Sequence, residues 1–128
     1  RLVQWPNSYD VLITENLFGD ILTDEASVIS GSMGLMPSAS VGEHTSLYEP
    51  IHSSYPQATG LNMANPLATI LSAAMMFEDA FGLKEEAQAI RAVVNKSLKE
   101  GIVTEDLAPK GRKAYKTSEV GDWLVANL

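Results

Sequence analysis

The stretch that decides the fold is Asn16-Leu-Phe-Gly-Asp-Ile-Leu-Thr-Asp-Glu-Ala-Ser-Val-Ile-Ser-Gly-Ser-Met-Gly-Leu35. It follows Tyr9-Asp-Val-Leu-Ile-Thr-Glu15, a run of apolar and β-branched residues that predicts a buried strand. Gly19 predicts a tight turn after that strand, and the apolar spacing predicts a helix over Leu17–Ile29. The expected order is therefore strand, turn and helix.

Two acidic residues, Asp20 and Asp24, lie four positions apart on the predicted helix. This spacing places both carboxylates on one face, with Cβ atoms about 5–6 Å apart. Such a pair repels unless a cation lies between the two groups, and Mg²⁺ prefers oxygen ligands. A carboxylate near a helix N-terminus also stabilises the helix itself, so the spacing alone leaves a structural role open.

A second informative stretch runs from Leu47 to Asn65 and is rich in small and polar residues. Pro50 and Pro56 exclude a helix, so the stretch predicts a short strand followed by a long loop. Loops of this length in a compact domain usually bind something. The groups suited to sugar hydroxyls and base edges are Ser53, Ser54, Gln57, Asn62 and Asn65, with the ring of His52 beside them. The alternative is a polar surface loop with His52 bonded to a neighbouring carbonyl.

Composition limits the class of protein. A chain of 128 residues with 45% apolar content is long enough for one core, and its net charge of −7 argues against nucleic acid or an anionic membrane as a partner. Cysteine is absent, which excludes disulfides and thiolate chemistry and fits a reducing cytoplasm. No Gly-x-Gly-x-x-Gly dinucleotide fingerprint is present. His44 stands alone in a polar turn, Gly42–Ser46, and is expected at the surface.

The remaining sequence predicts helices. Asn65 and Pro66 have the residue types of an N-cap and a first helical residue, and the apolar run that they open ends at Gly82. Lys84–Glu100 is amphipathic, with one apolar stripe and one charged face. A last helix is expected to begin at Thr117 and to pack its apolar residues inward. Residues 35–42 predict a buried extended segment before the polar turn.

The two stretches together resemble a known family. Asn-x-Phe-Gly-Asp-x-x-x-Asp-x-x-Ser-x-x-x-Gly-Ser-x-Gly, from Asn16 to Gly34, is similar to the signature of the isocitrate and isopropylmalate dehydrogenases. Glu-Pro-Ile-His, from Glu49, and the residues up to Pro66 resemble that family's adenosine-binding loop, and Ile102–Leu107 resembles a late Thr-x-Asp-Leu turn. The resemblance implies an α/β fold of three layers that is incomplete here, because the chain starts without Met and is expected to be the carboxyl-terminal portion of a longer protein. Residues 1–31 would end the central, dimer-forming subdomain, and 32–128 would form the C-terminal half of the cofactor-binding subdomain.

The resemblance also implies roles for individual residues. Asp20 and Asp24 would bind Mg²⁺ or Mn²⁺, His52 would lie on the adenine side of NAD, and Glu49 would lie near the nicotinamide ribose. The full set of NAD contacts carried over from the family is Glu49, His52, Ser53, Ser54, Tyr55, Pro56, Gln57, Ala58, Thr59, Gly60, Leu61, Asn62, Met63, Ala64 and Asn65.

Two positions depart from the family pattern. Ser53 stands where the family usually has Gly, which would strain the backbone if that position needs a positive φ. Gln57 stands where NAD-using members commonly have Asp, so it can bond the ribose hydroxyls without repelling a 2′-phosphate. NADP-using relatives carry Lys and Tyr there, and no Lys or Arg lies between Arg1 and Lys84. NAD with weakened discrimination is the expectation.

By resemblance, the function is metal-dependent oxidation of a 2-hydroxy acid by NAD followed by decarboxylation, most like the members that act on 3-isopropylmalate. The catalytic Tyr and Lys, the substrate arginines and a third metal-binding Asp are expected upstream, so no catalytic residue lies in this chain and we expect no activity from it alone. The helix Leu17–Ile29 would form a homodimer interface. Isocitrate, homoisocitrate and tartrate stay open as substrates, as does a noncatalytic regulatory subunit of this fold.

Overall fold

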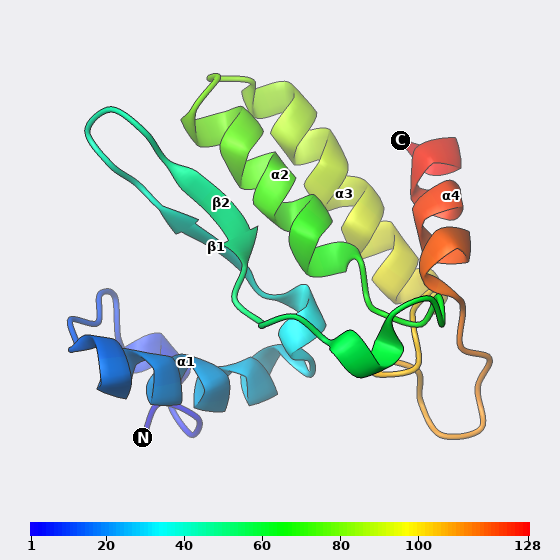
Figure 1. Cartoon of the computed structure of the whole chain (residues 1–128), viewed down its shortest axis with the longest axis horizontal. Coiled ribbons are helices and arrows are strands. Elements are labelled where there is room, and N and C mark those ends of the chain that lie inside the picture. The colour runs from blue at the N-terminus through cyan, green and yellow to red at the C-terminus, as the bar shows by residue number, and fades with distance from the viewer.

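The computed structural model describes residues 1–128 and contains four α-helices and one β-hairpin (Figure 1). The helices are α1 (Asn16–Ser30), α2 (Leu67–Asp79), α3 (Lys84–Glu100) and α4 (Thr117–Asn127). The strands are β1 (Pro37–Ser40) and β2 (Leu47–Pro50), and short 3-10 turns lie at Pro6–Ser8, Met33–Leu35 and Pro56–Ala58. None of the helices is both long enough and apolar enough to cross a membrane.

The hairpin, α2, α3 and α4 lie side by side in that order (Figure 1). The strands pair antiparallel, with Pro37 opposite Pro50 and Ser40 opposite Leu47. The buried core joins α2, α3 and α4 and consists of Leu67, Val93, Val94, Val120 and Leu124. Trp123 and Tyr115 pack against its edge. Helix α4 is therefore fixed to the pair formed by α2 and α3 through apolar packing.

Local sequence explains α3, the longest helix of this layer. The apolar stripe of α3 faces the core, and its charged face lies in solvent, as predicted. Acidic residues in its first turn, Glu85 and Glu86, and Lys99 in its last turn complement the helix dipole. Gly101 ends the helix in the left-handed conformation, with φ of 73°, which glycine adopts without strain.

Helix α1 lies apart from this layer (Figure 1). Gly31, with φ of 89°, ends it, and the chain then turns toward the hairpin. Its apolar side chains are largely exposed, among them Leu17 at 66% and Val28 at 68%. The predicted subdomain boundary falls at this turn, and the assignment of the two sides to subdomains stays a prediction.

The predicted strand at Tyr9–Glu15 is wrong. The segment is irregular, and its apolar side chains are exposed, with Ile13 at 97% and Val11 at 79%. A strand needs a hydrogen-bonded neighbour, and the sheet of this chain contains β1 and β2 alone. The turn predicted at Gly19 is also wrong, because Gly19 lies in the first turn of α1 and its N–H donates to the carbonyl of Glu15 at 2.7 Å.

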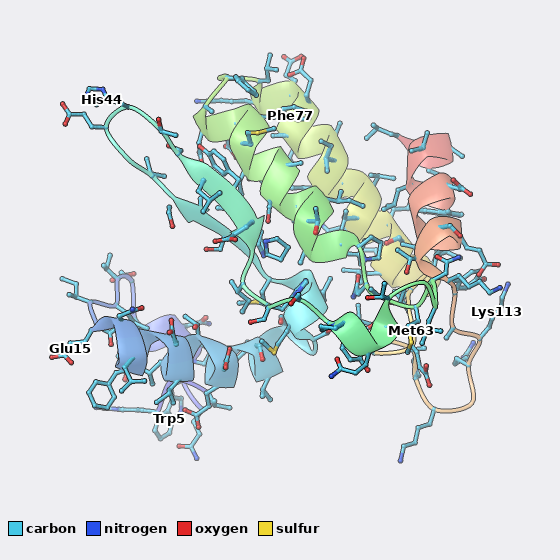
Figure 2. All side chains as sticks on the ribbon, in the orientation of Figure 1. Trp5, Glu15, His44, Met63, Phe77 and Lys113 are labelled. Carbon is cyan, nitrogen blue, oxygen red and sulfur yellow. The ribbon has the colours of Figure 1, made fainter.

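Most of the other local predictions are confirmed. β1 occupies the expected extended segment, which is half-buried or exposed and not buried as predicted; α3 has the predicted bounds, and α4 begins at Thr117. His44 is exposed in the turn between the strands, where Figure 2 shows it at the tip of the hairpin. Helix α2 begins one residue later than predicted, at Leu67, and the Asn65 side chain still accepts a hydrogen bond from the Leu67 N–H at 2.9 Å.

Candidate cofactor and metal site

The Asp20 cleft is a hollow of about 550 Å³ between the N-terminal end of α1 and the end of β2. Asp20 and Thr23 line it from α1, and Glu49, His52 and Ser53 line it from the other side. The fold therefore brings one predicted metal ligand and the start of the predicted nucleotide loop to the same hollow. These segments are about thirty residues apart in the sequence.

Asp24 lies one helical turn beyond Asp20 on the same helix. Both residues are exposed, and neither carboxylate accepts a hydrogen bond or forms an ion pair within the chain. Such a pair fits a shared divalent cation, since its oxygens are not committed to other partners. The chain contains no group of three His, Asp or Glu side chains arranged to hold a metal. Asp20 and Asp24 thus offer a partial ligand set.

The Asp106 pocket is a second hollow, of about 470 Å³. It is lined by Gly34, His52, Ser53, Tyr55, Met63, Ala64, Asn65, Glu105 and Asp106. His52 and Ser53 line both hollows, so the Asp20 cleft and the Asp106 pocket adjoin at these two residues. An extended ligand could reach from one hollow to the other past the His52 ring.

His52 makes one hydrogen bond in the chain, between its Nδ1 and the carbonyl of Ser53 at 3.0 Å. A carbonyl only accepts, so Nδ1 donates in this bond, and Nε2 has no hydrogen-bond partner in the chain. The bond is the one expected of His52 in the surface-loop alternative, although the ring also borders both hollows. Asn62 is the only non-glycine residue with a positive φ, so φ at Ser53 is not positive. The backbone strain that a serine would suffer at a positive φ is therefore absent at Ser53.

The Asn62 side chain makes hydrogen bonds within the chain. Asn62, with φ of 55°, donates from Nδ2 to the Ser118 hydroxyl at 2.8 Å and accepts from the Ser118 N–H at 3.0 Å. Its carbonyl also accepts from Thr117 N–H, and the Thr117 hydroxyl donates to the Ala64 carbonyl at 2.6 Å. The middle of the loop is thereby attached to the N-terminal end of α4. Contacts of the Asn62 and Asn65 amides with a nucleotide base remain a prediction.

The other predicted loop residues divide into three groups. Tyr55, Met63 and Ala64 line the Asp106 pocket, whereas Ala58 is buried. The remaining residues border neither hollow and are exposed, namely Ser54, Pro56, Gln57, Thr59, Gly60 and Leu61.

Asp106 is the residue of this site that sequence reasoning did not single out. Its carboxylate accepts hydrogen bonds from the Ser32 hydroxyl at 2.5 Å, the Asn65 amide at 2.9 Å and the Thr104 hydroxyl at 2.5 Å. Partial burial alone would raise the pKa of Asp106, but these hydrogen bonds from Ser32, Thr104 and Asn65, together with one from backbone, hold it below its ordinary value. The available signal was the Thr-x-Asp-Leu turn, which places a hydroxyl two residues before a carboxylate.

The family model that describes isocitrate/isopropylmalate dehydrogenase matches residues 1–124. The chain therefore belongs to the isocitrate/isopropylmalate dehydrogenase family, as the resemblance predicted. It is 56% identical over 125 residues to the 3-isopropylmalate dehydrogenase of Bacteroides fragilis strain YCH46, covering 98% of this chain and 35% of that protein. It is 51% identical over 121 residues to the 3-isopropylmalate dehydrogenase of Geobacillus kaustophilus, covering 94% of this chain and 33% of that protein.

Solved structures confirm the fold class. The isocitrate dehydrogenase of Methylococcus capsulatus superposes with a TM-score of 0.90 at 35% identity, covering 98% of this chain and 37% of that one. A beta-decarboxylating dehydrogenase of Thermococcus kodakarensis superposes with a TM-score of 0.83 at 38% identity, covering 98% and 36% of the two chains. The chain thus has part of the family's fold and spans about a third of the length of the relatives it matches.

Proposed function

We propose that the full-length protein carrying this chain catalyses the NAD-dependent and Mg²⁺- or Mn²⁺-dependent oxidative decarboxylation of 3-isopropylmalate to 4-methyl-2-oxopentanoate, a step of leucine biosynthesis. The single observation that supports this most is the meeting of the Asp20 cleft and the Asp106 pocket at His52 and Ser53. The identity of 51–56% to curated 3-isopropylmalate dehydrogenases favours this substrate over the related acids.

Asp20 and Asp24 would hold the divalent cation from one face of α1. When bound, the cation supplies positive charge that acidifies the substrate hydroxyl and favours loss of the carboxyl group. Glu49 shares the cleft with Asp20, so it borders the place where the substrate and the nicotinamide ring would meet. When bound, NAD would supply the acceptor for the hydride of the hydroxyl-bearing carbon, and this chain is assigned no base for the hydroxyl proton.

The Asp106 pocket would take the adenosine end of NAD. The rings of His52 and Tyr55 and the side chain of Met63 provide surfaces against which a base can pack. No lysine or arginine lines this pocket, whereas Glu105 and Asp106 do. A 2′-phosphate would meet negative charge there, which favours NAD over NADP.

Helix α1 would form the homodimer interface of the full-length protein. Its exposed apolar residues include Phe18 at 57% and Ile21 at 55%, together with Leu17, Val28 and Ile29. Exposed apolar side chains gathered on one helix favour burial against another surface. Sedimentation of the full-length protein as a monomer would contradict this part of the proposal. The proposal places the reaction in the cytoplasm, which the cysteine-free sequence allows.

The test is NADH formation by the full-length protein with Mg²⁺ and each of four acids, 3-isopropylmalate, isocitrate, homoisocitrate and tartrate, supplied separately. We expect the highest kcat/KM with 3-isopropylmalate, loss of activity on chelation, and none from the 128-residue chain alone. A preference for another acid would identify a related dehydrogenase. No turnover of any acid, with nucleotide binding retained, would favour the noncatalytic regulatory subunit.

A further inference from the structure

The Asp106 carboxylate joins three segments that are distant in sequence. Ser32 follows α1, Asn65 closes the nucleotide loop, and Thr104, which is 1% exposed, belongs to the turn after α3. Asp106 Oδ2 accepts from both Ser32 and Asn65, and Oδ1 accepts from Thr104. One side chain therefore links the end of the metal-binding helix to the end of the loop.

Asn65 links Asp106 to the start of α2 through two hydrogen bonds. Its Nδ2 donates to Asp106, and its Oδ1 accepts from the Leu67 N–H at 2.9 Å. Ser32 is likewise bonded at two points, because its hydroxyl donates to Asp106 and accepts from the Gly34 N–H at 3.0 Å. The orientations of both partners thus depend on the same carboxylate.

The chemistry of this position requires an ionised aspartate. Three donors converge on it, and a carboxylate is an acceptor at both oxygens, whereas an asparagine presents a donor at one of them. Hydrogen bonds to an ionised acceptor are also stronger than neutral ones. Asp106 lines the pocket as well, so a movement of its side chain alters the pocket directly.

We propose that Asp106 is a positioning residue, which fixes the closing end of the nucleotide loop through Asn65 against the segment that follows α1 through Ser32. Its effect on the reaction is to fix the position of the Asp106 pocket relative to α1, the helix that carries Asp20 and Asp24. This inference rests on the proposed function for its kinetic consequence, and on the hydrogen bonds alone for its structural one.

The test exchanges the aspartate at position 106 and the asparagine at position 65 in the full-length protein. Asp106→Asn removes one acceptor, and Asn65→Asp alone places two carboxylates face to face, so each is expected to raise the KM for NAD at least about tenfold. The double variant Asp106→Asn with Asn65→Asp restores a donor facing an acceptor, and we expect a KM for NAD within about threefold of the wild type. In both single variants the KM for the acid substrate should change less than that for NAD.

Ser32→Ala provides a milder variant that leaves Asp106 in place and removes the Ser32 hydroxyl, which donates to Asp106 and accepts from the Gly34 N–H, with an expected rise in KM for NAD of about threefold. Asp122→Asn, an exposed acid on α4, is the matched control and should change nothing. An unchanged KM for NAD in Asp106→Asn, or a double variant as impaired as the two single variants combined, would overturn the proposal.

Amide hydrogen exchange separates this proposal from the proposed function, because it needs no nucleotide. Asp106→Asn should speed exchange at the Gly34 and Leu67 amides, whose acceptors are Ser32 and Asn65. Faster exchange in a protein that reduces no NAD would reject the proposed function and retain the structural role of Asp106. Equal exchange rates in the variant and the wild type would reject that role whatever the protein binds.

Discussion

Gly34 packs directly against the side chain of Asn65. A Cβ atom built on Gly34 would lie 2.7 Å from both Cβ and Nδ2 of Asn65, closer than real contacts allow. The absence of a side chain at Gly34 therefore lets the segment after α1 approach the end of the loop that follows β2. Gly34 and Asn65 both line the Asp106 pocket, so this close approach also shapes the hollow.

We expect Gly34→Ala to destabilise the protein by about 1–3 kcal/mol, because the added methyl forces Asn65 to move. Gly121→Ala is the matched control, since a Cβ at Gly121 in α4 meets nothing within 4 Å. That change should stabilise by about 0.5–1 kcal/mol through helix propensity. Chemical denaturation of both variants measures the difference, and equal free energies of unfolding would contradict the packing argument.

Asp20→Asn and Asp24→Asn each remove one charge from the proposed metal site. Each change is expected to weaken Mn²⁺ or Mg²⁺ binding to the full-length protein by at least about tenfold. Loss of a residue that merely hydrogen-bonds to a metal ligand typically costs about that much, and loss of a ligand should cost no less. Calorimetric titration with Mn²⁺ gives the affinity. Asp79→Asn, at the exposed end of α2, serves as the control. Unchanged affinity in either Asp20→Asn or Asp24→Asn would remove that residue from the ligand set.

Gln57→Asp adds a carboxylate at a position where NAD-using relatives commonly have one. The ratio of kcat/KM for NAD to that for NADP should rise about tenfold, which corresponds to about 1.4 kcal/mol of added repulsion toward the 2′-phosphate. Gln57→Asn shortens the side chain without adding charge and should leave the ratio unchanged. A ratio that rises equally in both variants would show that side-chain length, and not charge, decides cofactor choice.

Ser53→Gly tests whether the departure at this position weakens nucleotide binding. Because φ at Ser53 is not positive, glycine relieves no strain and only adds freedom to the unfolded chain. We expect the NAD dissociation constant to stay within about threefold, less than 1.4 kcal/mol. A gain of tenfold or more in fluorescence titration would show that the serine side chain obstructs the cofactor.

The Asp106 carboxylate makes stability depend on acid pH. Its pKa in the folded state lies below the ordinary value of 3.8, so between the two values the unfolded state binds more protons. The stabilisation is complete above pH 3.8 and is lost as the pH falls through the folded-state pKa. The free energy of unfolding of the wild type relative to Asp106→Asn should thus be constant from about pH 5 to 7 and shrink below 3.8.

Denaturant titrations at several pH values measure this difference. The comparison isolates position 106, because every other ionisable side chain is the same in the two proteins. A difference that grows as the pH falls would contradict a lowered pKa for Asp106.

The helices were predictable because their determinants are local. The stripe of α3, the opening of α4 at Thr117 and the carboxylates of Asp20 and Asp24 on one helix face follow from spacing within a few residues. The loop after β2 was predictable from Pro50 and Pro56 for the same reason. The strand at Tyr9–Glu15 failed because a strand is completed by a partner elsewhere, and the apolar run only indicates a tendency to be buried.

By itself, the sequence determined the helical segments, the loop and membership of the family, since each depends on residue types at short, fixed spacings. Only the tertiary structure decided that His52 and Ser53 border two adjoining hollows, and that Asp106 holds Ser32 and Asn65 together. Those relationships join residues up to 74 positions apart, as with Ser32 and Asp106. Such distant residues meet because the packing of whole elements brings them together, and no local pattern encodes that contact.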